Sequence, residues 1–85
     1  MMVDRNLLGE RLHTIRRRRG LTLKELARRA GTSYVGVSRL EHGQKPQVSL
    51  DVVVRLAEVL DVSLDYLVGR KDEEEVRLEE IALAV

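Results

Sequence analysis

Basic side chains that could bind an anion are concentrated in the first half of the chain. Residues 1–45 contain 11 Lys and Arg against 4 Asp and Glu, a net charge of +7. Residues 46–85 contain 4 basic and 10 acidic residues, a net of −6, so the whole chain carries only +1. A chain polarised in this way can present a positive face to a polyanion while its acidic half stays clear. The alternative is that both halves are ordinary solvated surface.

The sequence lacks the residue patterns that catalysis or metal binding requires. It has no cysteine, and its two histidines, His13 and His42, do not have the i, i+4 spacing of a zinc-binding helix. There is no serine–histidine–acid order and no glycine-rich phosphate loop. A helical chain of 85 residues also leaves little room for a catalytic pocket. We therefore expect a protein that is not an enzyme and that needs no metal and no cofactor.

Residues 22–43 have the most informative pattern. They predict two short helices joined by a tight turn at residues 31–33. Val37 and Leu40 should anchor the second of these helices to the core. Its opposite face would then point outward, a face made of Tyr34, Val35, Gly36, Ser38 and Arg39. A helix with one face pinned and the other free is what reading a nucleic-acid groove requires.

Capping residues and apolar spacing predict five short helices and no strand. The expected ranges are 6–19, 23–30, 34–42, 50–60 and 64–68. Thr22 and Glu25 have the spacing of a capping box, in which each side chain bonds the other residue's amide. Ser33, Ser49 and Ser63 are the expected caps of the last three helices. Glycines should end four of the helices, at positions 20, 31, 43 and 69.

The core should consist of aliphatic side chains, because the chain has no Phe or Trp and only two Tyr. Apolar residues recur at helical spacing along each segment, which gives every helix one inward face. We expect one all-α domain over residues 6–69. The residues predicted to face inward are Leu8, Leu12, Ile15, Leu26, Ala27, Ala30, Val37, Leu40, Leu50, Val53, Ala57 and Leu60.

Residues 70–85 form a tail that is acidic first and apolar afterwards. Asp72 could cap a helix, and the acidic residues 73–75 would be favourable in its first turn. Leu78, Ile81 and Val85 would then share one face. Three interpretations stay open: a dimer contact, packing back on the domain, or a frayed or flexible end.

No membrane segment is predicted. The chain has neither the apolar run of a signal peptide at its start nor a stretch of about 20 apolar residues. We therefore expect a cytoplasmic protein with no membrane partner.

The order of these motifs resembles the Cro/lambda-repressor-like helix-turn-helix family, also called XRE-type. The resemblance covers residues 8–68 and includes all five helices and their turns. It implies a five-helix lambda-repressor-like DNA-binding domain and a sequence-specific transcriptional regulator, with repression as the expected direction. The alternative is an antitoxin-like or other regulator whose tail docks a second protein. The residues that carry the resemblance are 8–12, 15–16, 20–22, 25–27, 31, 37–43, 56–57 and 60–67.

The family resemblance also implies roles for single residues. The start of the third helix and one residue a turn later meet base edges in the family, and these positions are Tyr34, Val35 and Arg39. Each has a plainer alternative: packing for Tyr34, simple exposure for Val35, and a phosphate or solvent contact for Arg39. Relatives also pair an arginine of the first helix with a glutamate that ends the third. Arg16 and Glu41 match that pair.

Contacts to DNA phosphates are expected around the same helices. Ser33 resembles a family residue that touches a phosphate, and residues 42–45 resemble a loop that lies against the backbone. Leu23 stands where relatives often carry a phosphate-binding Gln, and Gly36 stands where they often have a polar residue. The run of arginines at 16–19 could clamp phosphate, but a salt bridge and a solvated helix end explain it better. The full set expected at phosphates is Thr22, Lys24, Arg28, Ser33, Ser38, His42, Gln44 and Lys45.

A single domain of this size covers about one half-site, so specific binding calls for two copies about one DNA turn (~34 Å) apart. Val52 and Val59 are spaced i, i+7 on the fourth helix, off its expected core face. With Leu78, Ile81 and Val85 of the tail, they are the expected contacts of a homodimer.

Overall fold

Five short helices make up all the regular structure that the computed structural model describes, which is residues 4–44 and 49–72. They are α1 (Arg5–Arg18), α2 (Leu23–Arg29), α3 (Tyr34–Glu41), α4 (Leu50–Leu60) and α5 (Leu64–Leu67). The predicted all-α, five-helix architecture is therefore confirmed. Within these residues no helix is long and apolar enough to cross a membrane. Lys45 and the tail residues Leu78, Ile81 and Val85 lie outside the described residues.

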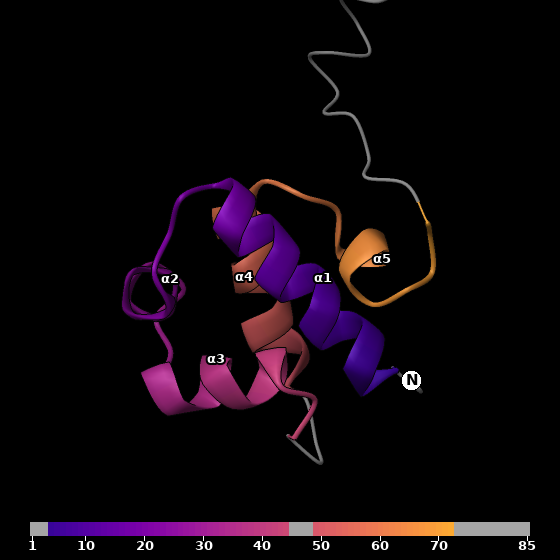
Figure 1. Cartoon of the computed structure of the whole chain (residues 1–85). Helices are drawn as coiled ribbons and strands as arrows, with labels where there is room; N and C mark the ends of the chain where they lie inside the picture. The colour runs from indigo at the N-terminus through magenta and orange to yellow at the C-terminus, as the bar shows by residue number, and fades with distance from the viewer. Residues whose placement is uncertain (1–3, 45–48, 73–85) are drawn as a thin grey trace, which may run out of the picture.

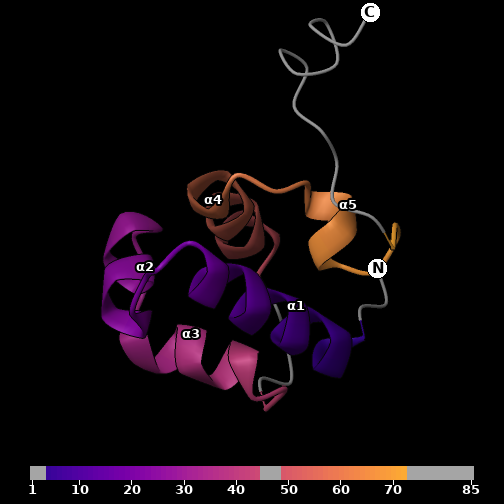
Figure 2. The same cartoon turned by 45° about the horizontal axis from the view of Figure 1, so that its top comes forward.

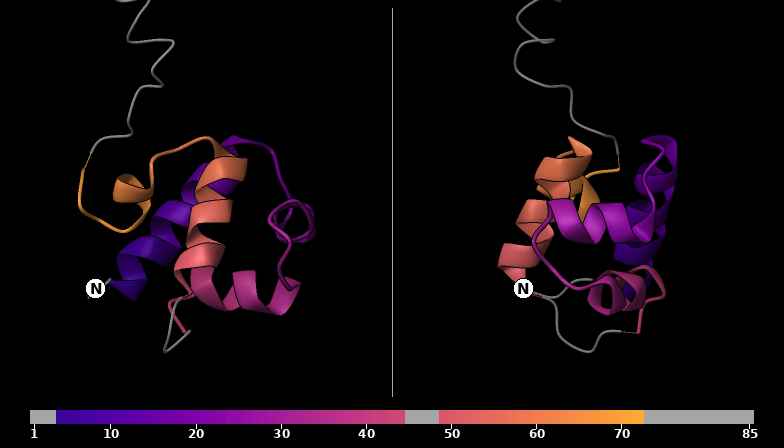
Figure 3. Two further views of the ribbon diagram at one scale, coloured as in Figure 1. Left: turned by 180° about the vertical axis from the view of Figure 1, so that it is seen from behind. Right: turned by 90° about the vertical axis from the view of Figure 1, so that its left-hand side faces the viewer.

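Helix α1 runs through the middle of the molecule. In Figure 1, α2 and α3 lie to one side of it, α5 lies to the other, and α4 lies behind. The view turned by 45° in Figure 2 and the two views in Figure 3 show the same arrangement. Because α1 contacts both α3 and α5, it connects the helix-turn-helix segment to the end of the domain.

Side-chain caps start four of the five helices. Asp4 accepts from the amides of Asn6 and Leu7, and the Thr22–Glu25 capping box has both of its hydrogen bonds, at 3.1 and 3.2 Å. Ser33 and Ser63 likewise accept amide protons at the starts of α3 and α5.

The predicted cap at Ser49 is wrong, because its side chain makes no capping hydrogen bond. Helix α4 begins without that bond, with Asp51 in its first turn to complement the helix dipole. The face that it buries consists of Val53, Leu56, Ala57 and Leu60.

The aliphatic core forms as predicted, with one exception among the residues expected to face inward. Leu50 is 58% exposed. It is the first residue of α4, and side chains on a helix tilt toward its N-terminus. Its side chain therefore extends past the end of the helix. The core also contains three residues that the sequence analysis did not assign to it: Leu56, Leu67 and Val68.

The two valines of α4 assigned to a dimer contact have less free surface than expected. Val52 and Val59 are half-buried and pack against the core cluster. The core face of α4 is wide enough to include them, because α4 is covered by both α2 and α5. Their role in a dimer contact stays a prediction.

Helices α1 and α3 touch backbone to backbone at Gly9. A Cβ atom on this buried residue would lie 2.6 Å from the carbonyl oxygens of both Leu40 and Glu41. No real Cβ atom sits so close to backbone atoms, so only glycine allows the two helices to approach this far. The contact places the last turn of α3 directly on α1.

We predict that Gly9→Ala destabilises the fold by roughly 3 kcal/mol, the upper end of what overpacking costs, because two backbone carbonyls must move. Thr14→Ala changes an exposed position of the same helix and should stay within about 0.5 kcal/mol of wild type. Urea unfolding of the three proteins measures both values. Equal stability of G9A and T14A would show that the helices do not cross as described.

The capping box of α2 should make stability depend on pH. The pKa of Glu25 is lowered, first by the hydrogen bond from the backbone N–H of Thr22, then by the Thr22 side chain, with Arg29 and Arg28 adding smaller effects. A lowered pKa contributes stability above the pKa of the unfolded chain, and that stability is lost as the pH falls through the folded-state pKa.

Glu25→Gln keeps an acceptor in the capping box but removes the titrating group. The difference in unfolding free energy between wild type and E25Q should therefore be largest near neutral pH and shrink as the solution is acidified. Thermal or urea unfolding of both proteins at a series of pH values measures it. A difference that is the same at every pH would contradict this account of Glu25.

Candidate nucleic-acid interface

One face of α3 is held by the core and the other is open. Val37 and Leu40 are 0% and 3% exposed, whereas Tyr34 and Val35 are 47% and 55% exposed. Arg39 is exposed as well and lies four residues after Val35, which places both side chains on the same face of the helix. All three predicted base-reading residues therefore lie on the outer side of α3.

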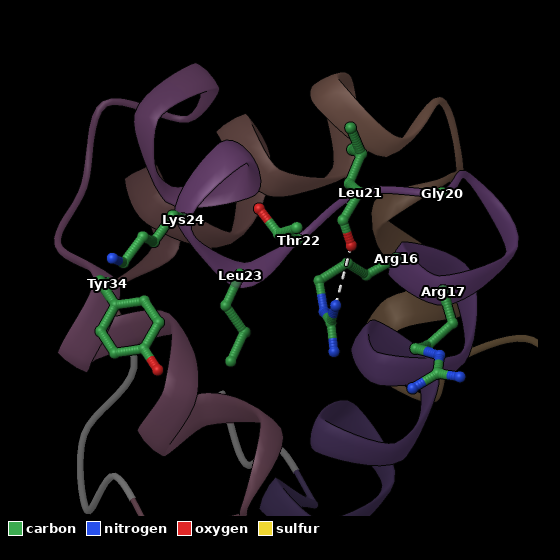
Figure 4. Close-up of a pocket in the computed structure, with 8 residues that line it drawn as sticks. All are labelled: Arg16, Arg17, Gly20, Leu21, Thr22, Leu23, Lys24 and Tyr34. Atoms are coloured by element: carbon green, nitrogen blue, oxygen red, sulfur yellow. Dashed lines mark hydrogen bonds between the residues drawn. The ribbon is translucent and has the colours of Figure 1, made fainter.

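An ion pair ties the end of α3 to α1. The Arg16 Nε donates to Glu41 Oε2 at 2.6 Å, and its Nη2 donates to Glu41 Oε1 at 3.2 Å. Nη1 donates to the carbonyl of Leu21, the bond drawn as a dashed line in Figure 4. The two side chains are only 10% and 3% exposed. The pair implied by the family resemblance is therefore present, and it has the forked geometry that makes arginine–carboxylate pairs specific.

His13 is a third member of this cluster that the sequence analysis missed. Its Nδ1 lies 2.9 Å from Glu41 Oε1 and 3.2 Å from Arg16 Nη2. The signal in the sequence was the i, i+3 spacing of His13 and Arg16, which places them on one face of α1. One carboxylate of α3 thus meets two side chains of α1.

An open hollow lies beside the start of α3. It has a volume of about 500 Å³ and is bounded by the end of α1, the start of α2 and the first residue of α3. Figure 4 shows Tyr34 and Lys24 next to each other on one side, Leu23 between them and Arg16, and Arg17 on the far side. The hollow therefore combines apolar side chains with three cationic ones, from Arg16, Arg17 and Lys24. Its lining residues are Arg16, Arg17, Gly20, Leu21, Thr22, Leu23, Lys24 and Tyr34.

The residues expected at phosphates that the structure describes, all but Lys45, lie in two groups. Thr22, Lys24 and Ser33 sit at the starts of α2 and α3, and Arg28 lies one helical turn after Lys24. The hydroxyls of Thr22 and Ser33 accept a capping amide, which leaves each its own O–H to donate.

The second group follows or overlaps the end of α3. His42 and Gln44 are exposed, and Ser38 is half-buried. The His42 Nδ1 lies 2.7 Å from the carbonyl oxygen of Ser38, so Nδ1 is the protonated nitrogen in that contact and Nε2 is left for another partner. Their roles at phosphates stay predictions.

A family model described as helix-turn-helix (HTH_3) matches residues 12–67, about two thirds of the chain. The chain belongs to the XRE-type helix-turn-helix family. The match includes the turn between α2 and α3, the Arg16–Glu41 pair and the hollow, so the site described above is the part of the chain that the family shares.

The similarity extends to relatives and to solved structures. The transcriptional regulator SinR of Bacillus licheniformis is 33% identical over 69 residues, which are 81% of this chain and 62% of SinR. A crystal structure of SinR, a master regulator for biofilm formation, in complex with DNA superimposes with a TM-score of 0.67 and 32% identity over 71% of this chain and 95% of that one. A SinR/SinI protein complex gives a TM-score of 0.71 and 28% identity over 91% of this chain and 74% of that one.

The chain thus spans less than two thirds of the length of the SinR protein it matches. The likeness concerns the helix-turn-helix domain.

Two arginines, Arg11 in α1 and Arg19 directly after it, have structural roles that the sequence analysis missed. The Nε of Arg19 donates to the carbonyl of Leu60 at 2.8 Å, which ties the end of α1 to the end of α4. Arg11 bonds residues at and beyond α5. The run of arginines at 16–19 is therefore not one basic patch, because two of its members are used inside the domain. Arg17 lines the hollow together with Arg16, whose guanidinium is already bonded to Glu41.

Removing Glu41 should leave the Arg16 guanidinium buried without its counter-charge. We predict that Glu41→Ala costs about 3–5 kcal/mol, as for other buried pairs that lose one partner. Glu10→Ala removes the same charge from an exposed position of α1 and should change stability by no more than about 0.5 kcal/mol. Thermal or urea unfolding compares the two. A small effect of E41A, similar to that of E10A, would mean that the pair is solvated.

Proposed function

We propose that this chain is a sequence-specific DNA-binding transcriptional regulator that reads the major groove of double-stranded DNA with α3. The observation that carries the proposal is that one face of α3 is buried in the core, while the opposite face, with Tyr34, Val35 and Arg39, is exposed. A SinR structure of the same fold is in complex with DNA, which supports this choice of ligand. The proposed activity is binding, without catalysis and without a cofactor.

The base contacts follow from the chemistry of the three exposed side chains. The planar guanidinium of Arg39 fits the O6 and N7 acceptors of a guanine. Val35 offers only apolar contact and would favour the methyl group of a thymine. Tyr34, at the edge of the hollow, can meet a thymine methyl with its ring or a phosphate with its hydroxyl.

The hollow beside α3 is the proposed binding site for the DNA backbone. A phosphate placed there would meet the Thr22 hydroxyl and the cations of Lys24 and Arg17. Arg17 is an addition to the residues expected from the sequence. Leu23 provides apolar surface in the wall, which can pack against a deoxyribose instead of bonding the phosphate.

The expected direction of regulation is repression, because blocking a promoter requires only that the site is occupied.

We also propose that the regulator acts as a two-fold homodimer on a palindromic site, since one α3 contacts few base pairs. A regulator of this kind works beside the chromosome, which in bacteria lies in the cytoplasm.

The second candidate function is docking of another protein through residues 70–85. It is favoured by the SinR/SinI complex, in which a related helix-turn-helix protein is bound to a protein partner. In that case the acidic and apolar tail would bind the partner protein, and two copies of this chain would not pair through the tail.

We predict that Arg39→Ala loses about 1–3 kcal/mol of discrimination at one base-pair position, because one bidentate base contact disappears. The fold should be unaffected, since the side chain is exposed. Arg55→Ala removes the same charge from an exposed position of α4 and should leave specificity unchanged. Selection of binding sites from a random duplex pool with the three proteins measures this. A uniform loss of affinity across all sequences would assign Arg39 to a phosphate.

The dimer can be tested with a chain that ends at Asp72. This truncation removes the proposed tail contact but keeps Lys71 and Asp72, which bond α1. We expect the full chain to sediment as a dimer at micromolar concentration and the truncated chain as a monomer. If both sediment as monomers, the tail does not pair two copies. If both are dimers, the contact lies on the domain itself.

A further inference from the structure

The guanidinium of Arg11 holds the segment that follows α5. Its Nη1 donates to the carbonyl oxygens of Tyr66 and Lys71, both at 2.6 Å, and its Nη2 lies 3.4 Å from Asp72 Oδ1. The guanidinium carbon is 4.3 Å from the centroid of the Tyr66 ring. The Arg11 side chain is only 13% exposed, whereas the Asp72 side chain is 97% exposed.

Further contacts hold residues 69–72 against α5 and the start of α1. The amides of Arg70 and Lys71 both donate to the carbonyl of Asp65, at 2.8 and 3.2 Å. At Gly69 (φ +87°) a Cβ atom would lie 2.8 Å from the Leu7 side chain, which shows how closely this turn approaches α1. Arg11 connects the end of α5 to the residues after Gly69, because it bonds the carbonyls of both Tyr66 and Lys71.

The position of this segment relative to α3 is the same in several views. In Figures 1 and 2, residues 69–72 lie beside α5 and the start of α1, and α3 lies on the other side of α1. Figure 3 shows the same separation from behind. Residues 69–72 are thus on the side of α1 away from the candidate DNA-binding face.

We propose that Arg11 is a positioning residue for the C-terminal end of the chain. By holding the carbonyls of Tyr66 and Lys71 together, it fixes the point from which the chain continues beyond Asp72, beside α5. In the proposed dimer, and here the inference rests on the proposed function, Arg11 sets the place on the domain where the tail begins. Arg11 itself contacts no DNA in this account.

Hydrogen exchange of the full-length chain followed by NMR tests the proposal directly. In Arg11→Lys the positive charge and the aliphatic stem are kept, but an ammonium cannot replace the planar fork. We expect the amides of Arg70 and Lys71 to exchange at least about tenfold faster in R11K, since the loss of one hydrogen bond to a charged group corresponds to such a factor. The amides of α4 should keep their protection, and Thr14→Ala, at an exposed position of the same helix, is the control.

Two outcomes would overturn the proposal. One is unchanged exchange at residues 70 and 71 in R11K. The other is equal acceleration of the α4 amides, which would make Arg11 a general stabilising residue. Tyr66→Leu provides a second test, because it removes the ring but keeps the carbonyl, and it should accelerate the same two amides to a smaller extent.

Binding measurements separate this proposal from the proposed function. R11K should weaken self-association of the full chain while its affinity for a single DNA half-site stays at the wild-type value. If the wild-type chain does not self-associate, the dimer is wrong, and the exchange rates alone decide the role of Arg11. If the half-site affinity falls together with self-association, Arg11 does not act through the tail and the proposal fails.

Discussion

The close contact between α1 and α3 determines what the rest of the structure can present. The backbones of α1 and α3 meet at Gly9, where no side chain would fit. Two turns further along α1, the Arg16 guanidinium forms an ion pair with the Glu41 carboxylate. These two contacts hold the last turn of α3, while Val37 and Leu40 hold its inner face. Because the helix is fixed at its end and along one side, Tyr34, Val35 and Arg39 are presented from a rigid support. A groove-reading helix requires such support, since base contacts depend on register.

The charge of the first half of the chain divides into structural and available parts. Arg11, Arg16 and Arg19 all donate to groups within the domain, so they stabilise the packing of α1 on α5, α3 and α4. The net charge of +7 thus overstates what residues 1–45 can offer to DNA. Apart from Arg16, which is bonded to Glu41, the cations at the hollow beside α3 are Lys24 and Arg17. This division lets one basic helix both assemble the fold and border the proposed interface.

Local patterns in the sequence were sufficient for the helices, most of their caps and nearly all of the core. They failed where a longer-range contact decides the outcome. Arg11 and Arg19 bond carbonyls 55 and 41 residues away. Because every residue has a backbone carbonyl, the sequence does not show which one accepts such a bond. Leu50 has the right spacing for the core, but it lies at the very start of α4. Val52 and Val59 appeared free because periodicity does not tell how many neighbours cover a helix. The site residues were located through the family resemblance together with the open face of α3, and Arg17 could be added only once the hollow was known.

NMR titration of the isotope-labelled protein with a duplex that contains its selected site tests the central claim most directly. The account predicts that the largest changes in amide chemical shift fall at the start of α3 and around the hollow, at Tyr34, Val35, Arg39, Lys24 and Arg17. The amides of α5 should change little, because α1 lies between that helix and the DNA. Changes concentrated on α4 and α5, with α3 unaffected, would contradict the claim that the open face of α3 reads the DNA.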